Sequence, residues 1–175
     1  MRLVFDESRG PMTASAMQGN DSGQGLQAVI RRLVPADIRS VSKLCVQHAS
    51  YEKAPALPPD HESRLKAAVF ASVPRVWCLV ADLGGVLVGY STCSLEFSTW
   101  RGCDYLYMDC LYIVEEHRGR GIGAAIMTAV SHLAKSLGCS SIEWQTPSWN
   151  FDAGRFYARI GARRQDKMRF TWRVP

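Results

Sequence analysis

The feature that most constrains this chain is a glycine- and arginine-rich stretch between a strand-like run and a helix-like run. Residues 118–123 read Arg-Gly-Arg-Gly-Ile-Gly, with an apolar run at 105–114 before them and helical spacing at 124–137 after them. Glycine lets backbone N–H groups approach a ligand closely, and the start of a helix presents unpaired N–H groups with a partial positive charge. This order of elements predicts a phosphate-binding loop.

Length and composition indicate a globular protein. The chain has 175 residues, of which 47% are hydrophobic and 21% charged, as expected for one ordinary domain. No apolar run approaches the roughly 20 residues of a membrane span, and the N-terminus lacks a signal-peptide pattern. We therefore expect a cytoplasmic protein with no membrane partner. Residues 1–27, rich in Gly, Ser and Gln, are predicted to be a flexible extension, and residues 28–175 a single domain.

Cysteine and histidine spacing indicates no metal site. The six cysteines include no C-x-x-C pair, and the four histidines share no ligand spacing. Several cysteines lie inside apolar runs, so buried reduced thiols are the favoured interpretation.

The net charge of +5 comes largely from arginines and lysines after position 154. A basic end can bind nucleic acid. The alternative is a solvated helix face followed by a strand, which we favour because no nucleic-acid reading motif accompanies the charges. No nucleic-acid partner is expected.

Residue periodicity predicts a mixed α/β chain. The expected elements, in order, are a strand at 28–34, a helix opening at 35–37, a second helix capped by Asp60, strands at 76–81, 86–97 and 105–114, a helix at 124–137, a strand at 140–145, a helix at 151–160 and a strand at 164–173. A glycine turn at 82–85 joins the second and third strands. The first helix has one apolar face, on which His48 is predicted to be a wall or core residue, together with Ile38, Val41, Leu44 and Cys45.

The glycine loop also fits a dinucleotide-binding fingerprint. Gly119, Gly121 and Ala124 match G-x-G-x-x-G/A, and Glu143 lies about 20 residues further on, where a ribose-binding acid belongs. Three observations oppose a dinucleotide. Four polar residues (115–118) separate strand and loop, an antiparallel hairpin precedes them, and only about a third of the chain follows.

Two motifs resemble the signatures of the GNAT N-acetyltransferase superfamily. Arg118-x-x-Gly121-x-Gly123 is similar to its acyl-CoA loop, [Q/R]-x-x-G-x-[G/A]. The segment from Asn150 to Gly161 resembles its second signature, N-x-x-A-x-x-F-Y-x-x-x-G. The resemblance covers roughly residues 28–173. It implies a central, mostly antiparallel sheet with splayed fourth and fifth strands, flanked by helices, and acetyl-CoA as co-substrate.

A narrower resemblance is to the spermidine/spermine and thialysine acetyltransferase branch. It rests on Tyr-Glu-Lys at 51–53, Trp100-x-Gly102, Leu-Tyr-Met-Asp at 106–109 and Trp-Asn at 149–150. Polyamine enzymes carry two adjacent acids in the central strand, whereas Cys110 follows Asp109 here. Members of this branch are typically homodimers, so the resemblance implies a homodimer.

The resemblance also implies which residues bind acetyl-CoA. Main-chain groups of the central strand would contact the pantetheine arm, and backbone N–H groups of the loop would hold the pyrophosphate. Asn150 either contacts the ligand or caps the following helix. The implied cofactor-binding residues are Leu111, Ile113, Arg118, Gly119, Arg120, Gly121, Ile122, Gly123, Asn150 and Tyr157.

Two side chains are expected to carry the chemistry. A phenol is protonated at neutral pH, so Tyr157 is the expected general acid for the departing thiolate. A carboxylate within an apolar strand is costly unless it is paired or used, so Asp109 is expected to bind the substrate ammonium or to accept its proton through a water. A buried salt bridge from Asp109 to an arginine is the structural alternative. Glu52 and Trp100 are weaker expected acceptor-binding residues.

Together these patterns predict an N-acetyltransferase that transfers the acetyl group of acetyl-CoA directly to a primary amine. The expected acceptor is a diamine, a polyamine or an amino-acid side chain. An aminoglycoside acceptor and a non-catalytic CoA-binding sensor with the same fold are the alternatives.

Overall fold

A computed structural model describes residues 27–174. This part of the chain forms two compact units that divide between Trp144 and Gln145. The predicted extension at 1–27 lies, apart from Gln27, outside the described residues. The expectation of a single domain over 28–175 stays a prediction.

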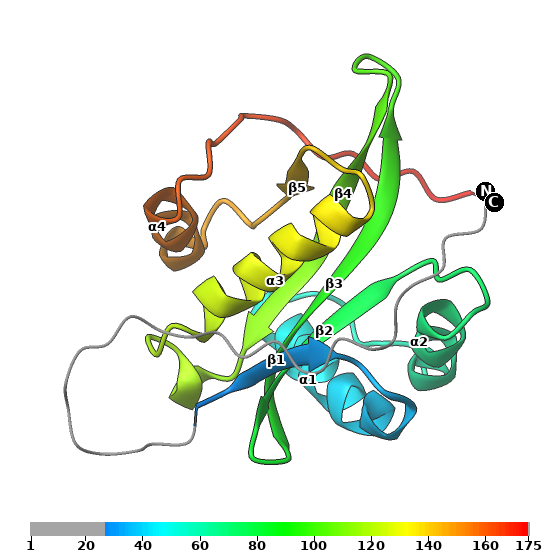
Figure 1. The fold of residues 1–175 in the computed structure, drawn as a ribbon, viewed down its shortest axis with the longest axis vertical. Coiled ribbons are helices and arrows are strands. Elements are labelled where there is room, and N and C mark those ends of the chain that lie inside the picture. Colours follow the sequence, from blue (N-terminus) through cyan, green and yellow to red (C-terminus); the bar gives the residue numbers. More distant parts are fainter. Residues whose placement is uncertain (1–26, 175) are drawn as a thin grey trace. The chain divides into compact units, whose positions relative to one another are not determined.

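A five-stranded sheet organises the first unit (Figure 1). Its strands lie in chain order, and each of the first three pairs antiparallel with the next, while the last two pair parallel. This mixed, mostly antiparallel sheet flanked by helices confirms the predicted fold class. The strands are β1 (Val29–Arg32), β2 (Trp77–Leu83), β3 (Val86–Ser98), β4 (Cys103–Ile113) and β5 (Ile142–Trp144).

The turn between β2 and β3 forms where the sequence predicted it. Gly84 and Gly85 both have positive φ, at 62° and 91°, which matches the twist of a two-residue hairpin. The carboxylate of Asp82 accepts a hydrogen bond of 2.7 Å from the Gly85 N–H. Local turn chemistry therefore sets the register of these two strands.

Helices cover both faces of the sheet in Figure 1, with α1 behind it and α3 in front. The helical elements of this unit are η1 (Pro35–Asp37), α1 (Ile38–Tyr51), α2 (His61–Val69), η2 (Glu115–His117) and α3 (Ile122–Ser136). The predicted apolar face of α1 is confirmed, because all five of its residues are buried. That face packs on Cys78, Val80 and Tyr90, which alternate along β2 and β3 toward α1.

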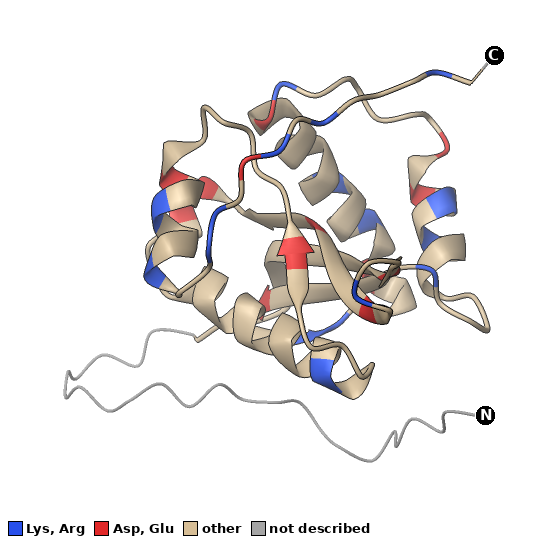
Figure 2. Ribbon diagram, turned by 90° about the horizontal axis from the view of Figure 1, so that it is seen from above, with Lys and Arg blue, Asp and Glu red and all other residues tan. Residues whose placement is uncertain are grey.

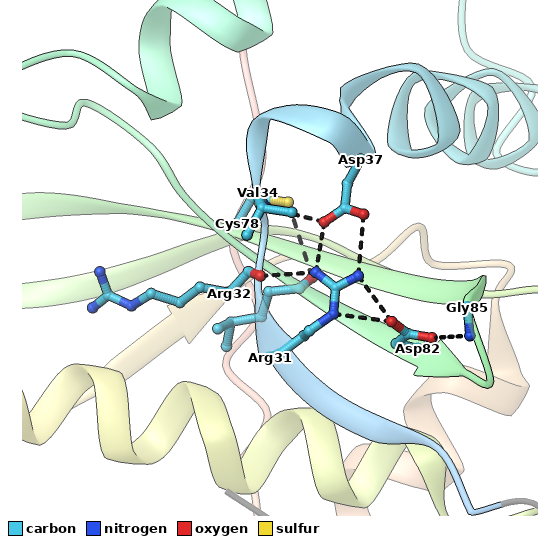
Figure 3. A network of polar contacts seen from close by, with 8 residues as sticks. Arg31, Arg32, Val34, Asp37, Cys78, Asp82 and Gly85 are labelled. Carbon is cyan, nitrogen blue, oxygen red and sulfur yellow. Dashed lines mark hydrogen bonds and ion pairs between the residues drawn. The ribbon is translucent and has the colours of Figure 1, made fainter. Parts of the chain in front are cut away.

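An arginine on β1 fixes the start of the first helical segment (Figure 3). The Arg31 guanidinium donates to both oxygens of Asp37, at 2.6 and 3.1 Å, and to Asp82, at 2.8 and 3.0 Å. Asp37 also accepts from the Val34 N–H at 3.0 Å. One side chain thereby ties β1 to η1 and to β2, on the side of the sheet that carries α1.

The second unit contains α4 (Phe151–Arg159). Its N-cap is Asn150, whose side-chain oxygen accepts from the Ala153 N–H at 3.1 Å, so the predicted capping role is confirmed. Gly161 follows the helix with φ 86°, as a terminating glycine should.

The predicted strand at 164–173 is wrong, because the described residues after α4 form no strand. Apolar residues alternate within this segment, but Met168, Phe170 and Trp172 are 82–88% exposed. A segment with alternating apolar residues forms a strand only where a neighbouring strand pairs with its backbone. The basic residues are spaced along this extended segment (Figure 2) and are exposed, which confirms their interpretation as solvated.

All six cysteines lie within the described residues and are free thiols, four of them buried. Within residues 27–174, the helices are too short or too polar to cross a membrane.

Candidate active site

The central strand β4 is only partly covered by β5. Residues 106–108 pair with residues 142–144, whereas β4 continues to Ile113. Across residues 27–174, no strand pairs with this side of β4 beyond Met108. The predicted splay of the fourth and fifth strands is therefore present, and it leaves an edge of backbone that an extended ligand can bond.

Arg101 fixes the paired end of these two strands. Its guanidinium donates to Glu143 at 2.7 Å and to the Ser141 hydroxyl at 3.0 Å, and it lies 4.9 Å from the centre of the Tyr105 ring. Glu143 is thus an ion-pair partner of Arg101, which removes its interpretation as a free ribose-binding acid.

The glycine loop leads from the open end of β4 into α3. Gly119 and Gly121 have φ of 73° and 81°, a left-handed conformation that costs other residues about 1–2 kcal/mol. Gly121 is the N-cap of α3, and no side chain caps it. The first N–H groups of α3 lack acceptors within the helix, so they are available to an anion at the helix end.

Gly123 differs from the other two glycines. The helix begins at Ile122, earlier than predicted, so Gly123 lies inside its first turn. A glycine within a helix costs roughly 0.5–1 kcal/mol relative to alanine. Positive φ accounts for Gly119 and Gly121 but not for Gly123, for which the predicted close approach of a ligand would be an explanation.

The two arginines of the loop have different surroundings. The Nε of Arg118 donates to the Ile113 carbonyl at 3.0 Å, and its guanidinium lies 4.7 and 5.7 Å from the ring centres of Tyr51 and Tyr112. Arg118 therefore fastens the loop to β4 and α1 with its side chain. Arg120 is exposed.

Behind the loop, His48 lies at the centre of an aromatic cluster. It is 8% exposed, its Nδ1 is 3.0 Å from the Tyr90 hydroxyl, and its ring stacks on Tyr112 at 5.1 Å. Its Nε2 is 3.3 Å from Glu52. Burial lowers the pKa of His48, against the opposing influence of Glu52 and Asp109. The prediction that His48 is a wall or core residue is confirmed.

Asp109 occupies a β-bulge. Met108 pairs with Cys93 and Cys110 pairs with Thr92, so Asp109 is the extra residue of β4. A bulge re-aims a side chain and bends the strand, and Asp109 is exposed although Met108 is buried. The buried salt bridge considered as an alternative is absent from the described residues. The premise that this carboxylate would be buried was wrong.

The sequence-predicted acceptor residues separate into two groups. Glu52 and Asp109 both lie close enough to His48 to influence its pKa. Trp100 is 98% exposed, in the turn between β3 and β4. Trp100 precedes the start of β4, and the glycine loop follows the end of that strand. The length of the strand, roughly 35 Å, therefore separates Trp100 from the glycine loop. Glu52 thus contacts His48, Asp109 lies near enough to influence the same ring, and Trp100 lies before the start of β4.

Two of the predicted site residues, Asn150 and Tyr157, belong to the second unit. Asn150 caps α4, as given above. Tyr157 is half-buried on α4, with its ring 5.2 Å from that of Phe156. Their predicted roles in binding and proton transfer stay predictions.

Sequence reasoning missed the tyrosines that surround His48. Tyr90 and Tyr112 lie on neighbouring strands and are register partners. Their position facing α1 follows from the strand pairing, which no local pattern encodes. His117 is half-buried, and its Nδ1 lacks a hydrogen-bond partner among the described residues.

A parted pair of central strands followed by a glycine loop on a helix N-terminus defines an acyl-CoA-binding fold. The chain belongs to the acetyltransferase (GNAT) family, whose model matches residues 41–162. It is an acetyl-CoA-dependent N-acetyltransferase of small amines.

Three known proteins illustrate its relationships. The chain is 32% identical to the thialysine N-epsilon-acetyltransferase of Bos taurus over 142 residues, which cover 77% of this chain and 83% of that protein. It is 25% identical to an aminoglycoside N(6')-acetyltransferase type 1 of Serratia marcescens, over 65% of this chain and 79% of that protein. An aminoglycoside N-acetyltransferase solved in complex with CoA shares the fold, with a TM-score of 0.73 at 17% identity over 86% and 97% of the two chains.

Proposed function

We propose that this enzyme acetylates the side-chain primary amine of a small amino acid of the thialysine or lysine kind. One observation carries the proposal: the Glu52 carboxylate at the end of α1 lies 3.3 Å from His48, and Asp109, in the β4 bulge just beyond the last residue paired with β5, influences the pKa of the same ring. Two carboxylates attract a cationic amine. The 32% identity to a thialysine N-epsilon-acetyltransferase supports the same class of acceptor.

The residues present fit acetyl-CoA. The first N–H groups of α3 and the backbone of Gly119 and Gly121 suit a pyrophosphate. The free edge of β4 at 109–113 suits an extended amide-bearing arm such as pantetheine. Exposed Arg120 adds positive charge beside the loop. Leu111 and Ile113 contribute main-chain groups in this proposal, and Asn150 and Tyr157 are further proposed contacts.

The proposed chemistry is direct transfer. Acetyl-CoA supplies a thioester whose carbonyl carbon accepts the amine. A backbone N–H of β4 donates to the thioester oxygen as negative charge develops there. Asp109 holds the ammonium and takes its proton through a water, since a solvated aspartate is a weak direct base. When the C–N bond has formed and the C–S bond breaks, Tyr157 donates a proton to the leaving thiolate, and the second proton lost by the acylated nitrogen restores the phenol through solvent.

The neighbour of Asp109 argues against a polyamine as the preferred acceptor. Burial, followed by the influence of Asp109, raises the pKa of Cys110 to about 12, so this thiol is neutral at physiological pH. Positions 109 and 110 of the strand therefore carry one negative charge, whereas polyamine enzymes carry two adjacent acids in the central strand. An amino acid carries less positive charge than spermidine and needs fewer acids.

The experiment is a measurement of thiol release from acetyl-CoA with a panel of amines. The panel contains thialysine, lysine, ornithine, putrescine, spermidine and one aminoglycoside, and kcat/KM is compared at fixed ionic strength. We expect thialysine or lysine to exceed spermidine by at least roughly tenfold, which corresponds to one charge-assisted contact. Preference for spermidine would contradict the acceptor assignment.

An aminoglycoside acceptor is the second candidate, favoured by the 25% identity to an aminoglycoside N(6')-acetyltransferase. The same panel decides between the two, because an aminoglycoside with the highest kcat/KM would establish that candidate. Tight CoA binding without turnover of any amine would instead indicate a sensor.

We further propose that the protein acts as a homodimer, on the basis of its resemblance to the spermidine/spermine and thialysine branch. Light scattering at micromolar concentration checks this, and a monomeric mass would contradict it. The cytoplasmic location also stays a prediction.

A further inference from the structure

We propose that His48 is a positioning residue that holds the Glu52 carboxylate in place for the acceptor amine. The inference rests on the proposed function, because it gives Glu52 an amine to bind. It concerns a side chain that contacts neither the glycine loop backbone nor any expected acetyl-CoA contact.

The protonation pattern of His48 follows from its two partners. A carboxylate only accepts hydrogen bonds, so the contact of 3.3 Å to Glu52 requires a proton on Nε2. Burial lowers the pKa of His48, so the ring is neutral at physiological pH and carries one proton. Nδ1 is therefore bare, and it accepts from the Tyr90 hydroxyl at 3.0 Å.

The chain of hydrogen bonds extends into the core. Burial raises the pKa of Tyr90 far above its ordinary value, so its hydroxyl keeps its proton and donates it to His48. The thiols of Cys45 and Cys110 interact with the same hydroxyl. Tyr90 thus donates to His48, His48 donates to Glu52, and Glu52 is the acceptor at the outer end of this series.

Stacking fixes the direction of the final donor. The His48 ring lies on Tyr112 at 5.1 Å with an angle of 24° between the rings, so Nε2 cannot swing away from Glu52 without breaking that contact. The Glu52 side chain remains 34% exposed, so one oxygen is held and the remainder of the carboxylate is open to water. A neutral ring also leaves the charge of Glu52 available to an ammonium.

The charged groups around His48 agree with this arrangement. Glu52 and Asp109 favour its protonation, whereas Arg118, held over Tyr51 and Tyr112, opposes it. A leucine would fill this position on the apolar face of α1 without needing any partner. The histidine adds only the two directed bonds, and the outer bond ends on a proposed substrate-binding acid.

The test compares variants of His48 and Glu52 by steady-state kinetics with thialysine, measuring KM for the amine and for acetyl-CoA separately. His48→Leu removes both bonds, His48→Asn retains polarity but is too short to reach Glu52, and His48→Gln retains a donor and an acceptor at similar reach. Glu52→Gln removes the acid. The matched control is His132→Leu, which replaces an exposed histidine on α3. Thermal melting checks that each variant is folded.

We expect His48→Leu and His48→Asn to raise the KM for thialysine roughly five- to tenfold, with the KM for acetyl-CoA within twofold of the wild type. His48→Gln should recover at least half of the loss. The double variant His48→Leu/Glu52→Gln should be no worse than Glu52→Gln, because His48 acts through Glu52.

Other results would overturn the inference. An unchanged thialysine KM in His48→Asn and His48→Leu, with a raised KM in Glu52→Gln, would show that Glu52 needs no support. Multiplying effects in the double variant would show that the two residues act independently. If His48→Leu fails to fold, the comparison of His48→Asn with His48→Gln still decides. Failure of the wild type to acetylate thialysine would instead refute the proposed function.

Discussion

The guanidinium of Arg118 lies 4.7 Å from the centre of the Tyr51 ring, which joins the first residue of the glycine loop to the last residue of α1. The same side chain donates to the Ile113 carbonyl at the end of β4. The loop that is expected to bind acetyl-CoA and the helix end that carries Glu52 are therefore connected through one arginine.

This relationship predicts that Arg118 acts through its planar shape rather than its charge. Arg118→Lys keeps the charge but loses the fork and the stacking, so it should raise the KM for acetyl-CoA as much as Arg118→Gln does. Arg120 supplies charge alone, so Arg120→Lys should resemble the wild type and Arg120→Gln should not. Rescue by Arg118→Lys in steady-state kinetics would show that Arg118 contacts phosphate directly.

Gly123 predicts opposite effects on stability and binding. Gly123→Ala removes a glycine from the first turn of α3 and should stabilise the free protein by roughly 0.5–1 kcal/mol. The added methyl group should weaken CoA binding, because the backbone then cannot approach the phosphate as closely. Thermal melting and calorimetric titration with CoA measure the two quantities.

Gly121→Ala is the comparison for that variant. Gly121 has φ 81°, so alanine should destabilise the free protein by about 1–2 kcal/mol as well as weaken binding. Unchanged CoA affinity in both glycine variants would remove the loop from the binding site.

The ion-pair network of Arg31 predicts a pH-dependent stability (Figure 3). Hydrogen bonding to Arg31 lowers the pKa of Asp37 in the folded protein. A depressed carboxyl pKa stabilises the fold above the unfolded value of about 3.9, and that stability is lost as the pH falls toward the folded value. Arg31→Met should therefore lower the free energy of unfolding at pH 7 by about 2 kcal/mol.

The difference between wild type and Arg31→Met should begin to shrink below about pH 4, where Asp37 of the unfolded chain becomes protonated, and should fall further as the pH approaches the lower pKa of Asp37 in the folded wild type. Urea unfolding at pH 7 and at lower pH measures it. An equal difference at every pH would mean that Arg31 contributes packing rather than its pairing with Asp37.

Much of the fold could be predicted from the sequence, because its signals are local. The 3.6-residue period over α1 identified five residues that are all buried, and the two glycines at 84 and 85 identified the hairpin. The alternation at 168–172 was an equally strong local signal and gave a wrong strand. A strand requires a partner, and pairing is not a local property.

The site was less predictable for the same reason. The bulge at Asp109 exists because the register of β3 and β4 shifts between Thr92 and Cys93. This shift is a property of two paired strands, so the sequence of β4 alone does not predict it. His48 and Tyr90 are 42 positions apart, so their bond follows only from the packing of α1 on β3. The glycine loop was predictable because six consecutive residues carry it.

Tyr157 carries a prediction about catalysis. Tyr157→Phe removes the hydroxyl and keeps the ring beside Phe156, so α4 should retain its structure. Loss of a general acid lowers kcat by roughly 10²-fold, and the affinity for CoA should stay within twofold. An unchanged kcat, measured where product release is not rate-limiting, would exclude Tyr157 as the proton donor.

The most direct test of the account is the identity of the product made from acetyl-CoA labelled with ¹³C in the acetyl group and thialysine. We predict that NMR will show a single N-acetyl product modified at the side-chain amine, formed by the wild type and much more slowly by Asp109→Asn. Acetylation at the α-amine, or CoA binding without any N-acetyl product, would contradict the account.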